Sequence, residues 1–211
     1  YRKCGFDLRG NNRLMAETKT SEEYDGTNWS AGGEANTAGG EFNNLAGTQT
    51  SALCVGGYVG SYNAESESYD GSSWSTSPAN PSANQAHGSA TAASTSDYFL
   101  CGGVNNVGQL DTAYTFDGSS WTTEATLTHT RFVGNLLGTT TDANYNSGSR
   151  FASDDSQNWN GSGWASGPAA SDDRYAPNNS TNCGGTKGSA VLGGGDDTAA
   201  SDASGRIQHL D

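Results

Sequence analysis

The sequence predicts an all-β fold built from one short structural unit that is copied several times. Glycine recurs at an interval of 46 residues, and a second glycine series with steps of 43 to 47 residues keeps pace with it. Around the second series the chain repeats an aromatic residue, an Asp-Gly or Asn-Gly step and a tryptophan. Repeat periods in the range of about 40 to 50 residues are typical of four-stranded propeller blades. The two series are Gly10, Gly56, Gly102, Gly148 and Gly194, and Gly26, Gly71, Gly118, Gly161 and Gly205.

The third copy shows the strand pattern of the unit. Residues 88–94 are small and β-compatible, and residues 97–101 are apolar and end on a diglycine. Residues 112–116 and 120–124 alternate around an Asp-Gly turn. Four short strands separated by turn signals indicate an antiparallel blade. The chain therefore predicts a single β-propeller of about five four-stranded antiparallel blades with atypical terminal blades. The approximate units are 1–40, 41–87, 88–135, 136–180 and 181–211.

The positions repeated most regularly are expected to hold the blades together. A tryptophan follows three residues after a glycine in four units, and a diglycine ends the second strand in two units. Leu, Ile, Val and Phe make up only 24 of 211 residues beside a net charge of −13, which by itself would indicate disorder. Regular tryptophan spacing favours the ordered repeat, because aromatic rings bury large areas. The structural positions are Trp29, Trp74, Trp121, Trp164, Gly56, Gly57, Gly102 and Gly103.

The Asp-Gly steps predict tight hairpin turns. A two-residue type I′ turn needs positive φ at both central residues, which Asp-Gly and Asn-Gly supply at low cost. Asp25, Asp70 and Asp117 begin three such steps, and Asn160 begins the fourth. An amide at Asn160 preserves the turn chemistry but would not replace a metal-binding or catalytic carboxylate. These residues are therefore expected to be structural.

Two phrases of the second unit carry a family resemblance. Residues 47–57 read Gly-Thr-Gln-Thr-Ser-Ala-Leu-Cys-Val-Gly-Gly, and residues 67–74 read Glu-Ser-Tyr-Asp-Gly-Ser-Ser-Trp. The diglycine, tyrosine and tryptophan in this order resemble the kelch repeat. More narrowly, the chain is similar to the Gly/Thr/Ala-rich kelch-like arrays of bacteriophage tail and virion proteins and of some bacterial secreted proteins. The first, fourth and fifth units depart from the pattern, which leaves closure of the ring open.

Composition argues against several classes of function. Ten basic residues against 23 acidic ones do not form the basic surface that nucleic-acid binding needs. No apolar run approaches the length of a membrane-spanning helix, so we expect no membrane insertion. Three histidines, His87, His129 and His209, match no recognisable catalytic constellation, so we expect a non-enzyme without a cofactor or metal. Calcium binding by an acidic loop pair such as Asp154-Asp155 remains an alternative.

The cysteines do not match a zinc site. Cys4, Cys54, Cys101 and Cys183 lack any Cys-x-x-Cys spacing. Cys54 and Cys101 share a repeat position and are expected to be small buried thiols. Cys4 and Cys183 fall in the first and last units, which a closed ring would make neighbours. A disulfide between Cys4 and Cys183 is therefore an alternative to four free thiols.

Loop tips supply the candidate binding residues. Tyrosine and asparagine at such tips suit adaptable polar recognition, for example of a sugar, although the same residues suit a merely soluble loop. The candidates are Tyr58, Tyr62, Asn63, Asn105 and Asn106. With the resemblance, they imply a recognition or structural module of a virion, which binds cell-surface glycan or neighbouring protein subunits. A secreted bacterial filament or adhesin subunit, assembling through propeller–propeller contacts as a homo-oligomer, is the alternative. Either function places the chain on a virion or in the extracellular space.

Overall fold

The fold consists of antiparallel β-sheets. The computed structural model describes residues 19–37, 44–58, 61–82, 88–146, 148, 155–169, 182–193 and 207–210. Within these ranges every regular element is a β-strand, and every strand pairing is antiparallel. The all-β class is therefore confirmed. Three of the sheets have the four strands that the sequence predicts.

The strands form five sheets, which we number in chain order. The first sheet, called here the first ribbon, pairs β1 (Glu22–Tyr24) with β2 (Trp29–Ala31). The second sheet contains β3 (Asn44–Thr48), β4 (Ser51–Val55), β5 (Ser66–Tyr69) and β6 (Trp74–Ser77). The third contains β7 (Ser89–Ser94), β8 (Asp97–Cys101), β9 (Ala113–Phe116) and β10 (Trp121–Thr123). The fourth contains β11 (Asn135–Gly138), β12 (Ala143–Asn146), β13 (Ser156–Trp159) and β14 (Trp164–Ser166). The fifth contains β15 (Asn182–Thr186), β16 (Ser189–Gly193) and β17 (Ile207–Leu210).

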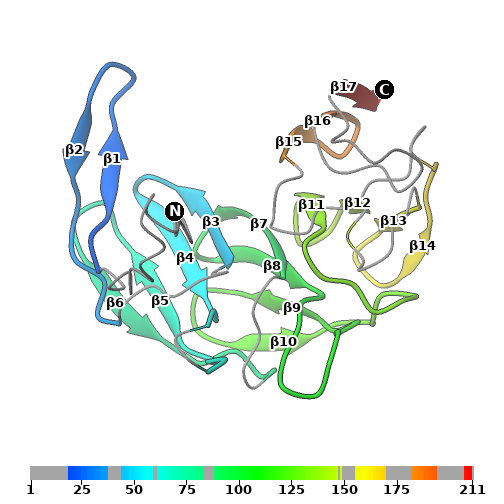
Figure 1. The fold of residues 1–211 in the computed structure, drawn as a ribbon, viewed down its shortest axis with the longest axis horizontal. Helices are drawn as coiled ribbons and strands as arrows, with labels where there is room; N and C mark the ends of the chain where they lie inside the picture. Colours follow the sequence, from blue (N-terminus) through cyan, green and yellow to red (C-terminus); the bar gives the residue numbers. More distant parts are fainter. Residues whose placement is uncertain are drawn as a thin grey trace, which may run out of the picture.

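The sheets follow one another along an arc (Figure 1). Contacts between neighbouring sheets run mainly through their first strands, with β7 lying between β3 and β11, and β15 lying next to β11. The first ribbon and the fifth sheet occupy the two ends of this arc in Figure 1. The described strands do not close a ring.

The apolar core lies between consecutive sheets. One cluster joins Leu53 and Val55 of β4 to the third sheet, where Tyr98, Leu100 and Phe116 are its buried members. A second cluster joins the third sheet to the fourth, and its buried members are Phe99, Cys101, Ala113, Leu127, Leu136, Ala143, Tyr145 and Trp159. Since each sheet is only four short strands wide, burial between two faces is what removes these rings from water.

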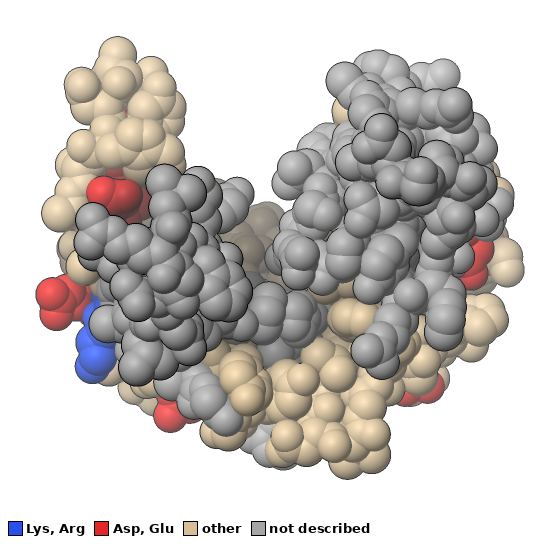
Figure 2. All heavy atoms as spheres, in the orientation of Figure 1, with Lys and Arg blue, Asp and Glu red and all other residues tan. Residues whose placement is uncertain are grey.

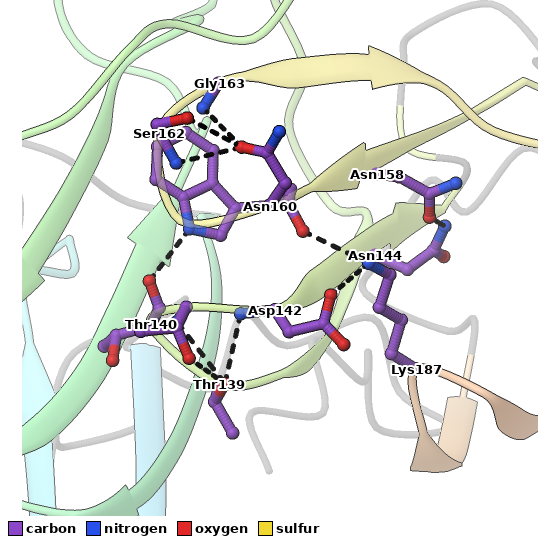
Figure 3. Close-up of polar contacts among 11 residues, drawn as sticks. Thr139, Thr140, Asp142, Asn144, Asn158, Asn160, Ser162, Gly163 and Lys187 are labelled. Atoms are coloured by element: carbon purple, nitrogen blue, oxygen red, sulfur yellow. Dashed lines mark hydrogen bonds and ion pairs between the residues drawn. The ribbon is translucent and has the colours of Figure 1, made fainter.

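The aromatic–turn–tryptophan phrase forms a four-residue hairpin loop, which corrects the predicted two-residue type I′ turn. Tyr69 pairs with Trp74 across the strands, and the other three copies have the same register. Only the glycine of each Asp-Gly or Asn-Gly step has a positive φ, between 89° and 98°. The first residue accepts hydrogen bonds through its side chain instead: Asp70 Oδ1 accepts from the backbone N–H groups of Ser72 and Ser73, each at 2.8 Å. Asn160 Oδ1 accepts the equivalent bonds from Ser162 and Gly163 at 3.0 Å (Figure 3).

The diglycines end the second strand of their sheets by a sharp change of backbone direction. Gly56 and Gly57 have φ of 68° and 120°, and Gly102 and Gly103 have 63° and 113°. A Cβ at Gly102 would lie 2.5 Å from the carbonyl oxygen of Arg131. Glycine is therefore required here both by backbone conformation and by close approach of the chain.

Several expectations fall outside the described part of the chain. Cys4 and His87 lie outside the described residues, and so do the side chains of Cys183 and His209. The predicted disulfide between Cys4 and Cys183 therefore lies outside the described part of the chain. Among the described cysteines, Cys101 is a buried free thiol and Cys54 is half-buried.

Candidate functional site

The tryptophans repeat one contact between neighbouring sheets. The Trp121 indole N–H donates to the carbonyl oxygen of Pro78 at 2.8 Å, and the Trp164 indole donates to that of Ala125 at 3.0 Å. In both cases the acceptor lies four residues after the tryptophan of the preceding sheet. Trp74 makes the equivalent contact indirectly, through the hydroxyl group of Ser21. It donates to Ser21 Oγ at 3.3 Å, and Ser21 Oγ donates to the carbonyl oxygen of Gly33 at 2.5 Å.

A second repeated contact uses the side chain that is second in the third strand of a sheet. Glu67 accepts from the backbone N–H of Asn36 at 2.9 Å and of Thr37 at 2.7 Å. Gln157 holds the same repeat position and accepts from the N–H of Thr128 at 2.9 Å. Sequence reasoning missed this contact. The sequence Ser-Glu-Ser-Tyr in β5 aligns with Ser-Gln-Asn-Trp in β13, and this alignment could have indicated the contact.

The third sheet shows why the contact is specific. Its residue in this position is Tyr114, and the preceding chain has Pro81 where Asn36 and Thr128 stand in their units. Proline has no N–H to donate. The third sheet therefore lacks the Glu or Gln acceptor, and residue 81 of the chain that precedes it has no N–H to donate. The Glu67 and Gln157 contacts are therefore best explained as hydrogen bonds that hold neighbouring sheets together.

A cavity of about 300 Å³ lies between the first ribbon and the second sheet. Between the later pairs of four-stranded sheets the space is filled by apolar clusters. Most of the lining residues are of polar types and one is aromatic, although the surface that they expose to the cavity is mainly apolar. Its residues are Lys19, Thr20, Ser21, Glu22, Ala35, Thr37, Leu45, Cys54, Gly56, Asn63, Glu65, Glu67 and Trp74. Small polar ligands commonly bind in such concave sites through a few fixed polar groups and a ring.

Some polar groups of this cavity already form hydrogen bonds within the chain, and one buried oxygen does not. The Glu67 carboxylate is occupied by the backbone of residues 36 and 37, and the Lys19 ammonium donates to the carbonyl oxygen of Asn36. Asn63 Oδ1 is buried and has no hydrogen-bond partner within the described part of the chain. A buried unpaired amide oxygen is costly, and this one lies beneath the surface of the cavity, so a ligand donor reaches it only when the Asn63 side chain moves.

The predicted loop residues fall into two groups. Tyr58 and Tyr62 form an isolated bridge and pack edge to face, with ring centroids 5.1 Å apart. Their loop starts and ends at residues of the cavity, since Asn63 N–H donates to the carbonyl oxygen of Gly57 at 3.0 Å, next to Gly56. Asn105 and Asn106 lie on the equivalent loop of the third sheet, away from this cavity lining.

Asn105 has a local structural contact, and Asn106 is exposed. The Asn105 side-chain oxygen accepts from the N–H groups of Val107 at 2.9 Å and Gly108 at 3.2 Å. This is the hydrogen-bonding pattern by which asparagine stabilises a turn. Asn106 is exposed beside it. Of the five predicted loop residues, Asn63 lines the cavity and Tyr58 and Tyr62 adjoin it.

The buried titratable groups are held in unreactive forms. Burial raises the pKa of the Cys101 thiol well above its ordinary value and raises the pKa of Tyr145 to about 12. Both groups therefore stay protonated at neutral pH. Arg131 is paired with Asp155 and lies over the Tyr145 ring, 5.9 Å from its centroid. The contacts of Arg131 join the third and fourth sheets.

No group of three or more His, Cys, Asp or Glu side chains in the described ranges could hold a metal ion. Among the described residues no helix has the length and apolar character needed to cross a bilayer. Acidic side chains are scattered over the face seen in Figure 2. Comparison with known proteins gives no family model and no curated protein that matches this chain.

Proposed function

We propose that this chain is a non-enzymatic recognition and assembly module with the architecture of a kelch-like β-propeller, carried on a virion as a tail, fibre or capsid-decorating protein. The antiparallel sheets, their order along the arc and their contacts through first strands support the propeller. The kelch-like phrases around Gly56 and Trp74 support the virion or extracellular setting. The unreactive thiol and phenol in the core are consistent with a non-enzyme.

The proposed ligand is a cell-surface glycan, and the observation that carries it is the cavity lined by Trp74 and Asn63. Sugars are bound by an aromatic face together with amide, carboxylate and hydroxyl groups that satisfy the ring hydroxyls. The cavity is lined by Trp74, Asn63, Glu65 and Ser21, which carry an indole, an amide, a carboxylate and a hydroxyl group. A volume of about 300 Å³ is at the small end for ligand pockets and suits one or two sugar rings.

A glycan array tests this proposal, followed by titration of the best glycan against two matched variants. Asn63→Ala removes an oxygen that has no partner in the described part of the chain, so folding should be little changed while glycan affinity falls about tenfold or more. Asn106→Ala changes an exposed asparagine on the equivalent loop and should leave affinity unchanged. Failure of every glycan to bind at millimolar concentration, or equal loss in both variants, would contradict glycan recognition at this cavity.

The alternative is a subunit of a secreted bacterial filament or adhesin that assembles through contacts between propellers. The exposed aromatic pair Tyr24 and Trp29 on the first ribbon favours this alternative. Assembly and glycan recognition are compatible, because the cavity and this pair use different residues.

A further inference from the structure

The first ribbon presents, uncovered, the face that other sheets bury against their predecessor. In the second, third and fourth sheets this face carries three side chains. They are the repeated position (Glu67, Tyr114 or Gln157), the buried aromatic residue that ends the third strand, and the tryptophan that pairs with this aromatic residue. These residues are buried or half-buried. The equivalents in the first ribbon are Glu22, Tyr24 and Trp29, and all three are exposed.

The exposure of the aromatic pair is large. Trp29 is 68% exposed and Tyr24 is 49% exposed, against 6% for Tyr69 and 2% for Phe116 at the position of Tyr24. The two rings already pack on each other, with centroids 5.1 Å apart and a tilt of 35°. This geometry matches Tyr69 with Trp74 and Phe116 with Trp121, whose centroids are 4.9 Å apart and tilted by about the same angle. The pair therefore has the shape of an inter-sheet contact without its partner.

The fourth sheet offers the matching acceptor. Ser156 Oγ donates to the carbonyl oxygen of Pro168 at 2.8 Å, as Ser21 Oγ donates to that of Gly33 in the first ribbon. The Ser21–Gly33 pair is what receives the Trp74 indole. No tryptophan lies between Trp164 and residue 211. Pro168 is exposed.

The fifth sheet contacts the inner part of the fourth through β15, and Pro168 at the outer edge is exposed, whereas Ser156 is buried. β15 lies against β11, and Lys187 in the β15–β16 turn pairs with Asp142 and donates to the carbonyl oxygen of Trp159 at 3.2 Å (Figure 3). Pro168 follows the outermost strand, β14. Within one chain the first ribbon stands at the opposite end of the arc from β14 (Figure 1).

We propose that the first ribbon of one copy docks on the outer edge of the fourth sheet of a second copy, with the Trp29 indole donating to the carbonyl oxygen of Pro168, as Trp121 and Trp164 donate to those of Pro78 and Ala125. The two surfaces are different, so the contact is head to tail, and repetition of it gives a ring or a filament. One ribbon is a small interface, so association of two copies should be weak and reversible. The proposal rests on the contacts between sheets and is independent of glycan binding.

Sedimentation velocity over a range of protein concentrations tests the docking. Wild-type chains should show reversible association that rises with concentration. Trp29→Ala should lower the association constant about tenfold or more while leaving the fold intact, since this side chain is mostly exposed. Val107→Ala is the control, because Val107 is 95% exposed on another loop, and it should associate as the wild type does.

A complementation experiment tests the polarity of the contact. Pro168→Arg places a long side chain at the acceptor edge and leaves Trp29 in place. Trp29→Ala and Pro168→Arg should each be monomeric alone, and their mixture should form a dimer that does not grow further. Association of Pro168→Arg with itself, or a wild type that stays monomeric to several hundred micromolar, would overturn the proposal.

Discussion

At the scale of single residues, the hairpin turns are held by one side-chain oxygen that accepts several N–H donors. Hydrogen bonds from Ser73 and Ser72 lower the pKa of Asp70 to about 2, and bonds from Ser119 and Ser120 lower the pKa of Asp117 further. The bonds favour the ionised carboxylate, which accepts them better than the neutral acid does. Asn160 makes the same contacts without a charge. The turn therefore needs an oxygen at this position and tolerates either side chain.

This arrangement predicts a specific loss of stability in acid. A folded pKa below the unfolded value near 4 stabilises the fold fully above that value, and the contribution is lost as pH falls through the folded pKa. We expect the urea midpoint of the wild type to fall between pH 4 and pH 2. The double variant Asp70→Asn, Asp117→Asn should fall less over the same window. Glu34→Gln, at an exposed position, is the control, and an identical pH profile for all three proteins would contradict the prediction.

At the scale of elements, the ties between sheets predict which polar substitution destabilises the fold. Gln157→Leu removes the acceptor of the Thr128 N–H at a position that is 1% exposed, and a lost buried hydrogen bond costs about 1–3 kcal/mol. Gln157→Glu should cost much less, because Glu67 has the same role two interfaces earlier. Tyr114→Gln should not stabilise the fold, because Pro81 has no N–H to donate to the new side chain. Urea unfolding of the three variants measures this, and equal losses for Gln157→Leu and Gln157→Glu would contradict it.

The sequence predicted the strands better than it predicted the turns or the cavity. Period, tryptophan spacing and diglycines are local signals, and strands β3 to β14 form sheets of the expected kind. The turn type was wrong because Asp-Gly fits two hairpin geometries, and the Ser-Ser or Ser-Gly that follows decides between them by donating to the first side chain. The cavity lies between two sheets, and its lining comes from residues 19 to 74, so no single repeat contained a signal for it.

At the scale of the whole molecule, each sheet depends mainly on its neighbours. Contacts between sheets join consecutive ones, and the two apolar clusters each belong to one interface. Stability in such stacked repeats is approximately a sum of unit terms and interface terms. Unfolding should therefore proceed by parts, and a lesion in one interface should leave distant sheets protected. The first ribbon, with an exposed aromatic face, should open most easily.

Two matched cavity-forming variants test this prediction by hydrogen exchange. Phe99→Ala removes a fully buried ring that packs on Trp159 and Trp164, at about 3–5 kcal/mol, and should expose amides of β11 to β14 more than those of β3 to β5. Leu53→Ala, at about 2–5 kcal/mol in the other cluster, should give the reverse order. If every described strand lost protection equally in both variants, the sheets would unfold as one cooperative unit. Opposite gradients would instead locate the energy of the fold at the faces between sheets, which is where the repeated tryptophans lie.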